Sequence, residues 1–207
     1  HSNDVKSMIL DKKYIPNLSK DLKNTYNLDV KSGELDLIVG GPPCQGYSGI
    51  GHRRSYSVNK EQIPSNFLYQ DMAYLISKLQ PKIFLFENVR GLLSGRWKRG
   101  GEKGEIWSDV LETFNSLKGY QTSWKLVKAK DYGVPQNRPR VLLVGVRNDI
   151  RLKNIKSKTA DGFLPDPSGT PPDPVDILSD LIDPNYKKKK FNEKYVKDPR
   201  SDYQKSL

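Results

Sequence analysis

Cysteine and histidine are scarce in this chain, whose 207 residues include one cysteine, Cys44, and two histidines, His1 and His52. A single thiol excludes an internal disulfide and suits a reducing interior. These three side chains also cannot supply the usual ligand set of a structural zinc site, so we expect no metal. No apolar run approaches the ~20 residues needed to cross a bilayer, and the N-terminus lacks a signal-peptide pattern.

Positive charge is in excess. Lys and Arg number 35 against 24 Asp and Glu, which gives a formal net charge of +11. This balance favours polyanionic partners through long-range attraction and counterion release. On charge alone, a solvated lysine-rich surface explains it equally well.

The order of the apolar runs predicts an α/β fold. Residues 35–39 and 83–86 form short apolar runs typical of buried strands. Residues 66–79 and 106–117 carry apolar side chains at helical spacing. Strand, helix, strand and helix in this order predict a mostly parallel sheet, because parallel neighbours need a crossover connection between them.

The pattern changes in the second half of the chain. Residues 120–129 and 140–147 are strand-like, and the turn residues between them predict an antiparallel hairpin at the edge of the sheet. Five prolines within residues 161–175 indicate a linker or an ordered surface arm. Residues 176–182 are expected to form one or two helical turns.

Three short segments contain the residues that could carry chemistry. The first two directly follow predicted parallel strands, whose carboxyl ends are where ligands and catalytic groups gather, so a thiol and a carboxylate should meet at one edge of the sheet. A thiolate favoured by nearby arginines can add to an electron-poor carbon. An inert cysteine is the alternative, and its position in a turn weakens that alternative. The segments are Gly41-Pro42-Pro43-Cys44-Gln45-Gly46-Tyr47-Ser48, Glu87-Asn88-Val89 and Gln136-Asn137-Arg138-Pro139-Arg140.

These segments resemble the signature motifs of the cytosine carbon-5 methyltransferases, in the family's order and at comparable spacing. The resemblance covers roughly residues 15–150, and the sequence around Cys44 is similar to that of the bacterial DNA-modifying branch. It implies a Rossmann-like S-adenosylmethionine-dependent methyltransferase core, acting in the bacterial cytoplasm near the nucleoid. The partner it implies is double-stranded DNA, and it also allows a cognate restriction endonuclease system.

The resemblance also implies a mechanism. Cys44 adds to carbon-6 of a cytosine flipped out of the duplex, and Glu87 hydrogen-bonds the ring N3 and the exocyclic amine. Arg138 and Arg140 hold the base carbonyl, the neighbouring backbone and the catalytic loop. After methyl transfer to carbon-5, loss of the carbon-5 proton expels Cys44. The loop after Cys44 closes over the DNA, with contacts expected from Gln45, Ser48, Arg53 and Arg54; His52 is expected to be a surface residue.

Four residues match positions that hold S-adenosylmethionine in the family. Asp21 would accept a hydrogen bond from the adenine amine, and Leu22 would pack beside it. Pro43 and Leu68 would line the same pocket. A surface or helix-capping role for Asp21 is the alternative.

The sequence also departs from the family. Its glycine-rich Phe-x-Gly-x-Gly cofactor motif and its target recognition domain are not found. We therefore expect a truncated catalytic core over residues 1–151, with a linker and the start of the recognition region over residues 152–207. Such a chain alone should bind the cofactor weakly and methylate poorly.

The sequence also allows other functions. The same chemistry on transfer RNA uses an almost identical core, and a degenerate core could serve as a non-catalytic nucleic-acid-binding module. A cysteine hydrolase would need a histidine base, and only His52 is near. Residues 96–99, Arg-Trp-Lys-Arg, could meet phosphate with Trp97 stacking on a base, or form a solvated flank.

Overall fold

The computed structural model describes residues 13–28, 33–43, 64–98, 100–150, 164, 166–181, 198–199 and 202–205. The chain divides into two compact units. Residues 1–127 and 139–165 form the first unit, and residues 128–138 and 166–207 form the second. Among the described residues, no helix is both long and apolar enough to span a membrane.

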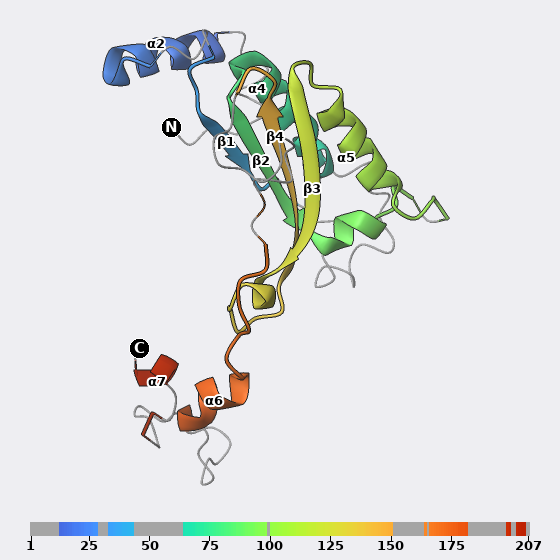
Figure 1. The fold of residues 1–207 in the computed structure, drawn as a ribbon. Helices are drawn as coiled ribbons and strands as arrows, with labels where there is room; N and C mark the ends of the chain where they lie inside the picture. Colours follow the sequence, from blue (N-terminus) through green and yellow to red (C-terminus); the bar gives the residue numbers. More distant parts are fainter. Residues whose placement is uncertain are drawn as a thin grey trace. The chain divides into compact units, whose positions relative to one another are not determined.

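The first unit is built on a four-stranded sheet in the order β1-β2-β4-β3 (Figure 1). Strand β1 is parallel to β2, whereas β2 and β4 are antiparallel. The chain runs along β3, turns, and returns along β4, so these two form the predicted hairpin with β3 at the edge. The strands are β1 Leu37–Gly40, β2 Ile83–Val89, β3 Tyr120–Lys128 and β4 Pro139–Arg147.

Helices precede and follow β2 as predicted. The helix expected over residues 66–79 is α4, Leu68–Leu79, entered through the 3-10 turn η4, Pro64–Phe67. The helix expected over residues 106–117 is α5, Glu105–Asn115, and a 3-10 turn η5, Arg90–Ser94, joins β2 to it. Helix α2, Tyr14–Tyr26, was not predicted.

Strand β2 is longer than its apolar run. The sequence predicts a strand stopped by Glu87, but β2 continues through Val89 because β4 provides backbone partners to its end. Glu87 is paired in register with Leu142, and Val89 with Arg140. The ladder with β4 therefore extends the strand, and Glu87 lies within it rather than after it.

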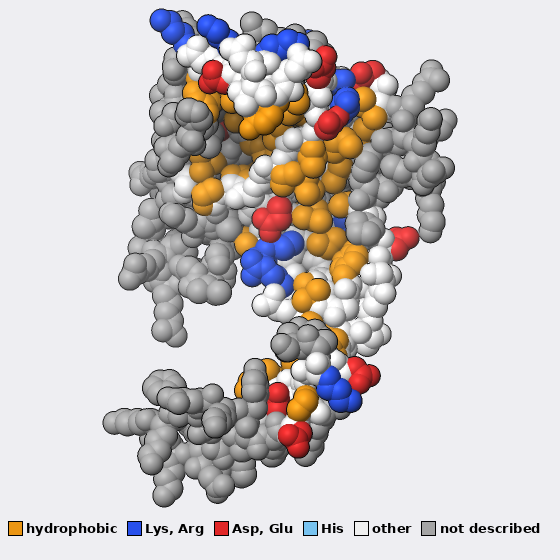
Figure 2. Space-filling model, turned by 90° about the vertical axis from the view of Figure 1, so that its left-hand side faces the viewer, with side chains coloured by type: hydrophobic (Ala, Val, Ile, Leu, Met, Phe, Trp, Pro, Cys, Tyr) orange, Lys and Arg blue, Asp and Glu red, His pale blue; other side chains and the backbone are white. Residues whose placement is uncertain are grey.

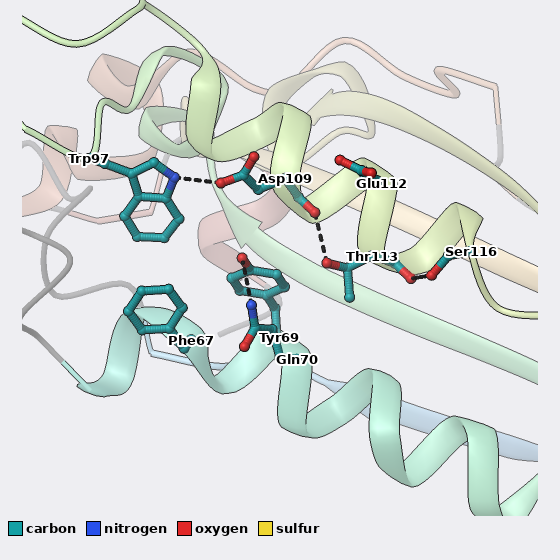
Figure 3. Close-up of a pocket in the computed structure, with 8 residues that line it drawn as sticks. All are labelled: Phe67, Tyr69, Gln70, Trp97, Asp109, Glu112, Thr113 and Ser116. Carbon is teal, nitrogen blue, oxygen red and sulfur yellow. Dashed lines mark hydrogen bonds between the residues drawn. The ribbon is translucent and has the colours of Figure 1, made fainter.

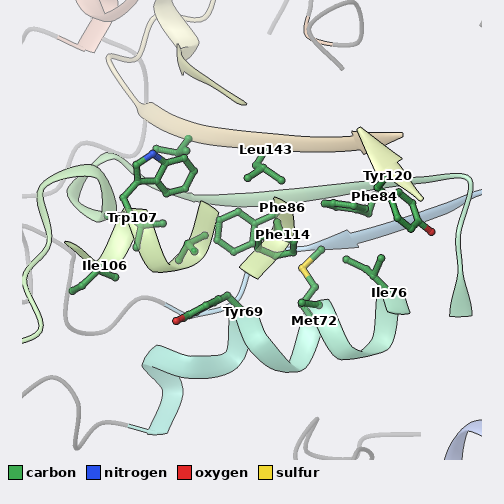
Figure 4. Close-up of a cluster of buried hydrophobic side chains, with 14 of the residues drawn as sticks. Tyr69, Met72, Ile76, Phe84, Phe86, Ile106, Trp107, Phe114, Tyr120 and Leu143 are labelled. Atoms are coloured by element: carbon green, nitrogen blue, oxygen red, sulfur yellow. The ribbon is translucent and has the colours of Figure 1, made fainter. Parts of the chain in front are cut away.

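Helices α4 and α5 cover one face of the sheet and form the main core (Figure 4). Alternate residues of β2, namely Phe84 and Phe86, point to this face and are fully buried. The ring of Phe114 from α5 lies 5.5 Å from that of Phe84 and 5.1 Å from that of Phe86. Apolar side chains spaced at the helical period in α5 and at the strand period in β2 thus pack into one layer.

Two glycines allow this layer to close. A side chain at Gly145 of β4 would place its Cβ 2.0 Å from Cε1 of Phe84, so the Phe84 ring occupies the space above Gly145. A Cβ at Gly40 would lie 2.5 Å from Sδ of Met72 in α4. At both positions glycine is needed for close approach.

The opposite face of the sheet is covered less evenly. Val144 and Val146 of β4 are buried there with Leu164. On β1, in contrast, Leu37 and Val39 are 50% and 61% exposed. Viewed from the side where β1 lies, hydrophobic side chains gather in a band that is interrupted by neighbouring acidic and basic groups (Figure 2).

Two polar side chains fasten the end of the sheet remote from the carboxyl end of β2. Arg147 donates from Nη1 to the carbonyl of Gly33 at 3.0 Å and to that of Gln80, and its Nε lies 2.6 Å from Oδ1 of Asp149. This hydrogen bond lowers the pKa of the Asp149 carboxyl. The hydroxyl of Tyr120 donates to the carbonyl of Pro81 at 2.5 Å, and burial raises the pKa of Tyr120 to about 12.

In the second unit, the described residues form only short helical segments. It contains η6, Ala129–Asp131, α6, Pro174–Leu178, η8, Ser179–Leu181, and α7, Asp202–Lys205. The side chain of Asp173 caps α6 by accepting from the backbone N–H of Val175 at 2.8 Å, which explains the helical turns expected here. Gln204 of α7 donates to the carbonyl of Ile177 at 2.9 Å.

Candidate functional site

The carboxyl ends of β1 and β2 lie side by side, as the sequence predicts. Gly40, the last residue of β1, is paired with Phe86, so residues 41–43 continue beside the end of β2. Strand β4 runs in the opposite direction and begins at this same edge with Pro139. Residues 41–43, the end of β2 and the start of β4 therefore lie at one edge of the sheet.

Glu87 and Arg140 form an ion pair at this edge. They are diagonal neighbours on the same face of the sheet, because Arg140 is paired with Val89 and side chains alternate along each strand. The Nε of Arg140 lies 2.6 Å from Oε1 of Glu87, and the side chains are 20% and 38% exposed. Such a partly exposed pair adds little stability, so its main effect is to fix the direction of the carboxylate.

The second carboxylate oxygen of Glu87 lies against a glycine. A Cβ placed on Gly41 would be only 3.1 Å from Oε2 of Glu87. The absence of a side chain at residue 41 therefore leaves room for the carboxylate beside the chain that leads away from β1. Arg140 and Gly41 together define where the two oxygens of Glu87 lie.

Asn88 joins the two strand ends directly. Its side chain is buried, and its Nδ2 donates to the carbonyl of Pro42 at 3.2 Å while its Oδ1 accepts from the backbone N–H of Val89 at 2.9 Å. Buried amides keep such bonds because losing them costs free energy. This contact fixes the backbone two residues before Cys44.

Sequence reasoning did not single out the roles of Asn88 and Gly41. The available signal was an asparagine directly after an apolar strand, since asparagine is depleted in strands and needs partners when buried. Its partner Pro42 is 46 residues away in the chain, which no local pattern reveals.

The grouping of the remaining predicted catalytic and DNA-contacting residues with this pair stays a prediction. Arg138 belongs to the second unit and is exposed; its backbone N–H donates to the carbonyl of Gln136 at 3.0 Å. The others lie outside the described residues, as does His52. They are Cys44, Gln45, Ser48, Arg53 and Arg54.

The four residues predicted to hold a cofactor are described in the first unit. Asp21 is exposed on α2, and Leu22 beside it is half-buried. Pro43 is exposed directly after β1, and Leu68, the first residue of α4, is half-buried. All four side chains are at least partly accessible to a ligand, and their contact with S-adenosylmethionine stays a prediction.

Trp97 does not have the role suggested by its basic neighbours. The sequence allowed it to stack on a base or to lie on a solvated flank. Instead its ring is buried against that of Phe67, with centroids 5.0 Å apart, and its indole N–H donates to Asp109. The large apolar ring is held in the fold, while Arg96 and Lys98 on either side are exposed.

Comparison with known proteins finds one family. The model of the C-5 cytosine-specific DNA methylases matches residues 9–206. The type II methyltransferase M.BspRI of Lysinibacillus sphaericus is 43% identical over 115 residues, which is 56% of this chain and 24% of the relative. M.XorII of Xanthomonas oryzae is 31% identical over 160 residues, or 76% of this chain and 34% of the relative. The chain thus spans about a quarter to a third of these relatives.

Solved structures give similar matches. A DNA modification methyltransferase encoded within an E. coli prophage is 28% identical, with a TM-score of 0.47, over 73% of this chain and 34% of its own. A DNMT2 mutant from Spodoptera frugiperda is 22% identical, with a TM-score of 0.40, over 73% of this chain and 40% of its own.

Proposed function

Because this chain belongs to the C-5 cytosine-specific DNA methylase family, we propose that it is the catalytic part of an enzyme that methylates carbon-5 of cytosine in DNA through a covalent cysteine adduct. The observation that supports this most directly is the Glu87–Arg140 pair, which lies beside the chain that leads to Cys44. Residues 1–151 would form the core, and residues 152–207 would lead toward a region that recognises the target.

Cys44 and Glu87 carry the proposed chemistry. The thiolate of Cys44 forms a bond to carbon-6 of the cytosine, and the electron pair displaced from the ring double bond makes carbon-5 nucleophilic. The protonated carboxyl of Glu87 passes its proton to N3, which neutralises the negative charge that thiolate attack places on the ring, and the resulting carboxylate accepts a hydrogen bond from the exocyclic amine. After carbon-5 is methylated, removal of its proton re-forms the double bond and releases the thiolate.

The arginines position groups around the base. Arg140 lies 2.6 Å from Oε1 of Glu87 and would fix the direction in which the carboxylate faces the cytosine edge. Arg138 would contact the base carbonyl or the neighbouring backbone. The loop carrying Gln45, Ser48, Arg53 and Arg54 would contact the DNA strand from which the base has been flipped.

S-adenosylmethionine supplies the methyl group when bound. In this chain Asp21 would accept from the adenine amine, and Leu22, Pro43 and Leu68 would contact the adenosyl group. The glycine-rich motif that grips the methionine end in the family is not found in this sequence, so the isolated chain should bind the cofactor poorly.

Covalent trapping tests the proposal. The full-length protein is mixed with duplex DNA containing 5-fluorocytosine and with S-adenosylmethionine, and a denaturation-resistant adduct is sought. Fluorine at carbon-5 cannot leave as a proton, so the adduct should accumulate on the peptide containing Cys44. Cys44→Ser should abolish it and Glu87→Gln should strongly reduce it, whereas Glu102→Gln, an exposed carboxylate outside the site, should leave it unchanged.

The substrate is tested in the same assay. Trapping on an equivalent transfer RNA but not on DNA would assign the chain to RNA methylation, and no adduct on either would indicate a non-catalytic binding module. A role in restriction-modification is proposed because the relatives include type II methyltransferases. It predicts that methylated DNA resists a cognate endonuclease of the same host.

A further inference from the structure

A groove lies between the start of α4 and one side of α5 (Figure 3), and neither Glu87 nor Arg140 is among the residues that line it. Its volume is about 790 Å³, and its lining includes the carboxylates of Asp109 and Glu112. Among the described residues that line it there is no lysine or arginine. Helix α5 as a whole carries three acidic residues and no basic one, in a chain whose net charge is +11.

One wall of the groove is a preorganised aromatic pair. The rings of Phe67 and Trp97 are stacked with an interplanar angle of 7°. The indole N–H of Trp97 donates to Oδ2 of Asp109 at 2.5 Å, which locks the aromatic wall to one carboxylate oxygen. The Asp109 carboxylate therefore lies directly beside the aromatic pair.

Tyr69 contributes a hydroxyl with an unused proton. The residue is 4% exposed, and its oxygen accepts a long hydrogen bond of 3.4 Å from the side chain of Gln70. Within the described part of the chain, the hydroxyl has no acceptor for its own proton. Burial, and secondarily the charge of Asp109, raise the pKa of Tyr69, so the hydroxyl remains a donor at neutral pH. A buried donor without an acceptor is costly, and a ligand oxygen would satisfy it.

We propose that the groove binds an arginine residue of a partner protein. The guanidinium would lie against the aromatic wall and pair with Asp109 and Glu112, because arginine combines planar stacking with charge-assisted hydrogen bonds to carboxylates. The carbonyl of the same arginine would accept a hydrogen bond from the hydroxyl of Tyr69. Methyl transfer plays no part in this inference, so it stands or falls separately from the proposed function.

The test uses N-acetyl-arginine methylamide as the probe and the 207-residue chain. The indole N–H resonance of Trp97, assigned with Trp97→Phe, is followed by NMR at constant ionic strength. We expect a saturable shift of this resonance, with an affinity in the millimolar range because partly exposed ion pairs contribute little each. The Trp124 resonance serves as an internal reference, because Trp124 is not among the residues that line the groove.

Variants that remove one carboxylate charge, inside or outside the groove, test whether the carboxylates bind the probe. Glu112→Gln and Asp109→Asn should each weaken binding about threefold, and Asp109→Asn keeps an oxygen for the Trp97 indole. Glu102→Gln removes one charge outside the groove and should leave binding unchanged. A shift reproduced by sodium chloride, one retained in both groove variants, or binding of spermidine in preference to the arginine probe would overturn the proposal.

Discussion

At the scale of single residues, Gly41 controls the position of the Glu87 carboxylate. Gly41→Ala would add a Cβ 3.1 Å from Oε2 of Glu87 and displace it. Since misplacing a catalytic group by a fraction of an ångström to one ångström is costly, we expect the full-length enzyme to lose roughly tenfold to a hundredfold in kcat. Steady-state methylation assays measure this loss, and unchanged kcat in a folded variant would show that Glu87 tolerates the shift.

Asn88 is expected to matter for both stability and chemistry. Asn88→Asp keeps an oxygen for the N–H of Val89 but turns the donor to Pro42 into a second acceptor facing a carbonyl. We expect a loss of about 1–3 kcal/mol in unfolding free energy, measured by urea denaturation, together with slower adduct formation at Cys44. Asn24→Asp introduces the same charge at an exposed position of α2 and is the matched control.

Tyr120 makes the unfolding free energy depend on pH in the alkaline range. Its folded-state pKa is raised to about 12, so the native chain retains a proton that the unfolded chain releases near pH 10. Its contribution to stability is therefore complete below pH 10 and is lost as the pH rises toward 12. In Tyr120→Phe, the fall of the unfolding free energy between pH 10 and 12 should be smaller by this contribution. Urea denaturation at several pH values between 9 and 12 measures it, and the same dependence on pH in both chains would contradict the prediction.

At the scale of elements, the contact between β4 and the core depends on Gly145. Gly145→Ala would force its Cβ into the ring of Phe84, so β4, β2 or the ring must move. Overpacking of this kind typically costs about 1–3 kcal/mol. Urea denaturation should show this loss, and Phe84→Leu in the same chain should recover part of it. Strictly additive effects would mean that the two side chains do not compete for this space.

The elements also show how far sequence reasoning reaches. The apolar periodicity of α4 and α5 is local, so both helices were predicted. The end of β2 was not, because Glu87 to Val89 become strand only by pairing with β4. Helix α2 was missed because its first turn has neither a capping side chain nor an acidic residue. In the site, the sequence motifs identified Glu87 and Arg140 one by one. Their contact could not be predicted, because it depends on the register between β2 and β4, which are far apart in the sequence.

At the scale of the whole molecule, the chain is short relative to its relatives, and its isolated activity is the quantity to measure. We expect the 207 residues to bind duplex DNA in a salt-dependent way because of the +11 charge. Methyl transfer should remain near background because part of the cofactor site is not found in this sequence. Parallel assays of the chain and the full-length enzyme test this, and comparable rates would show that the chain is sufficient.

The pairing of β2 with β4 also has a consequence for the order of folding. The hairpin of β3 and β4 joins neighbouring segments, whereas β2 and β4 are paired across about fifty to sixty residues of intervening chain. Closing such a long loop costs entropy before its contacts form. The Glu87–Arg140 pair should therefore be among the last contacts to form on refolding, and backbone amides of β2 should gain protection from hydrogen exchange later than those of α5.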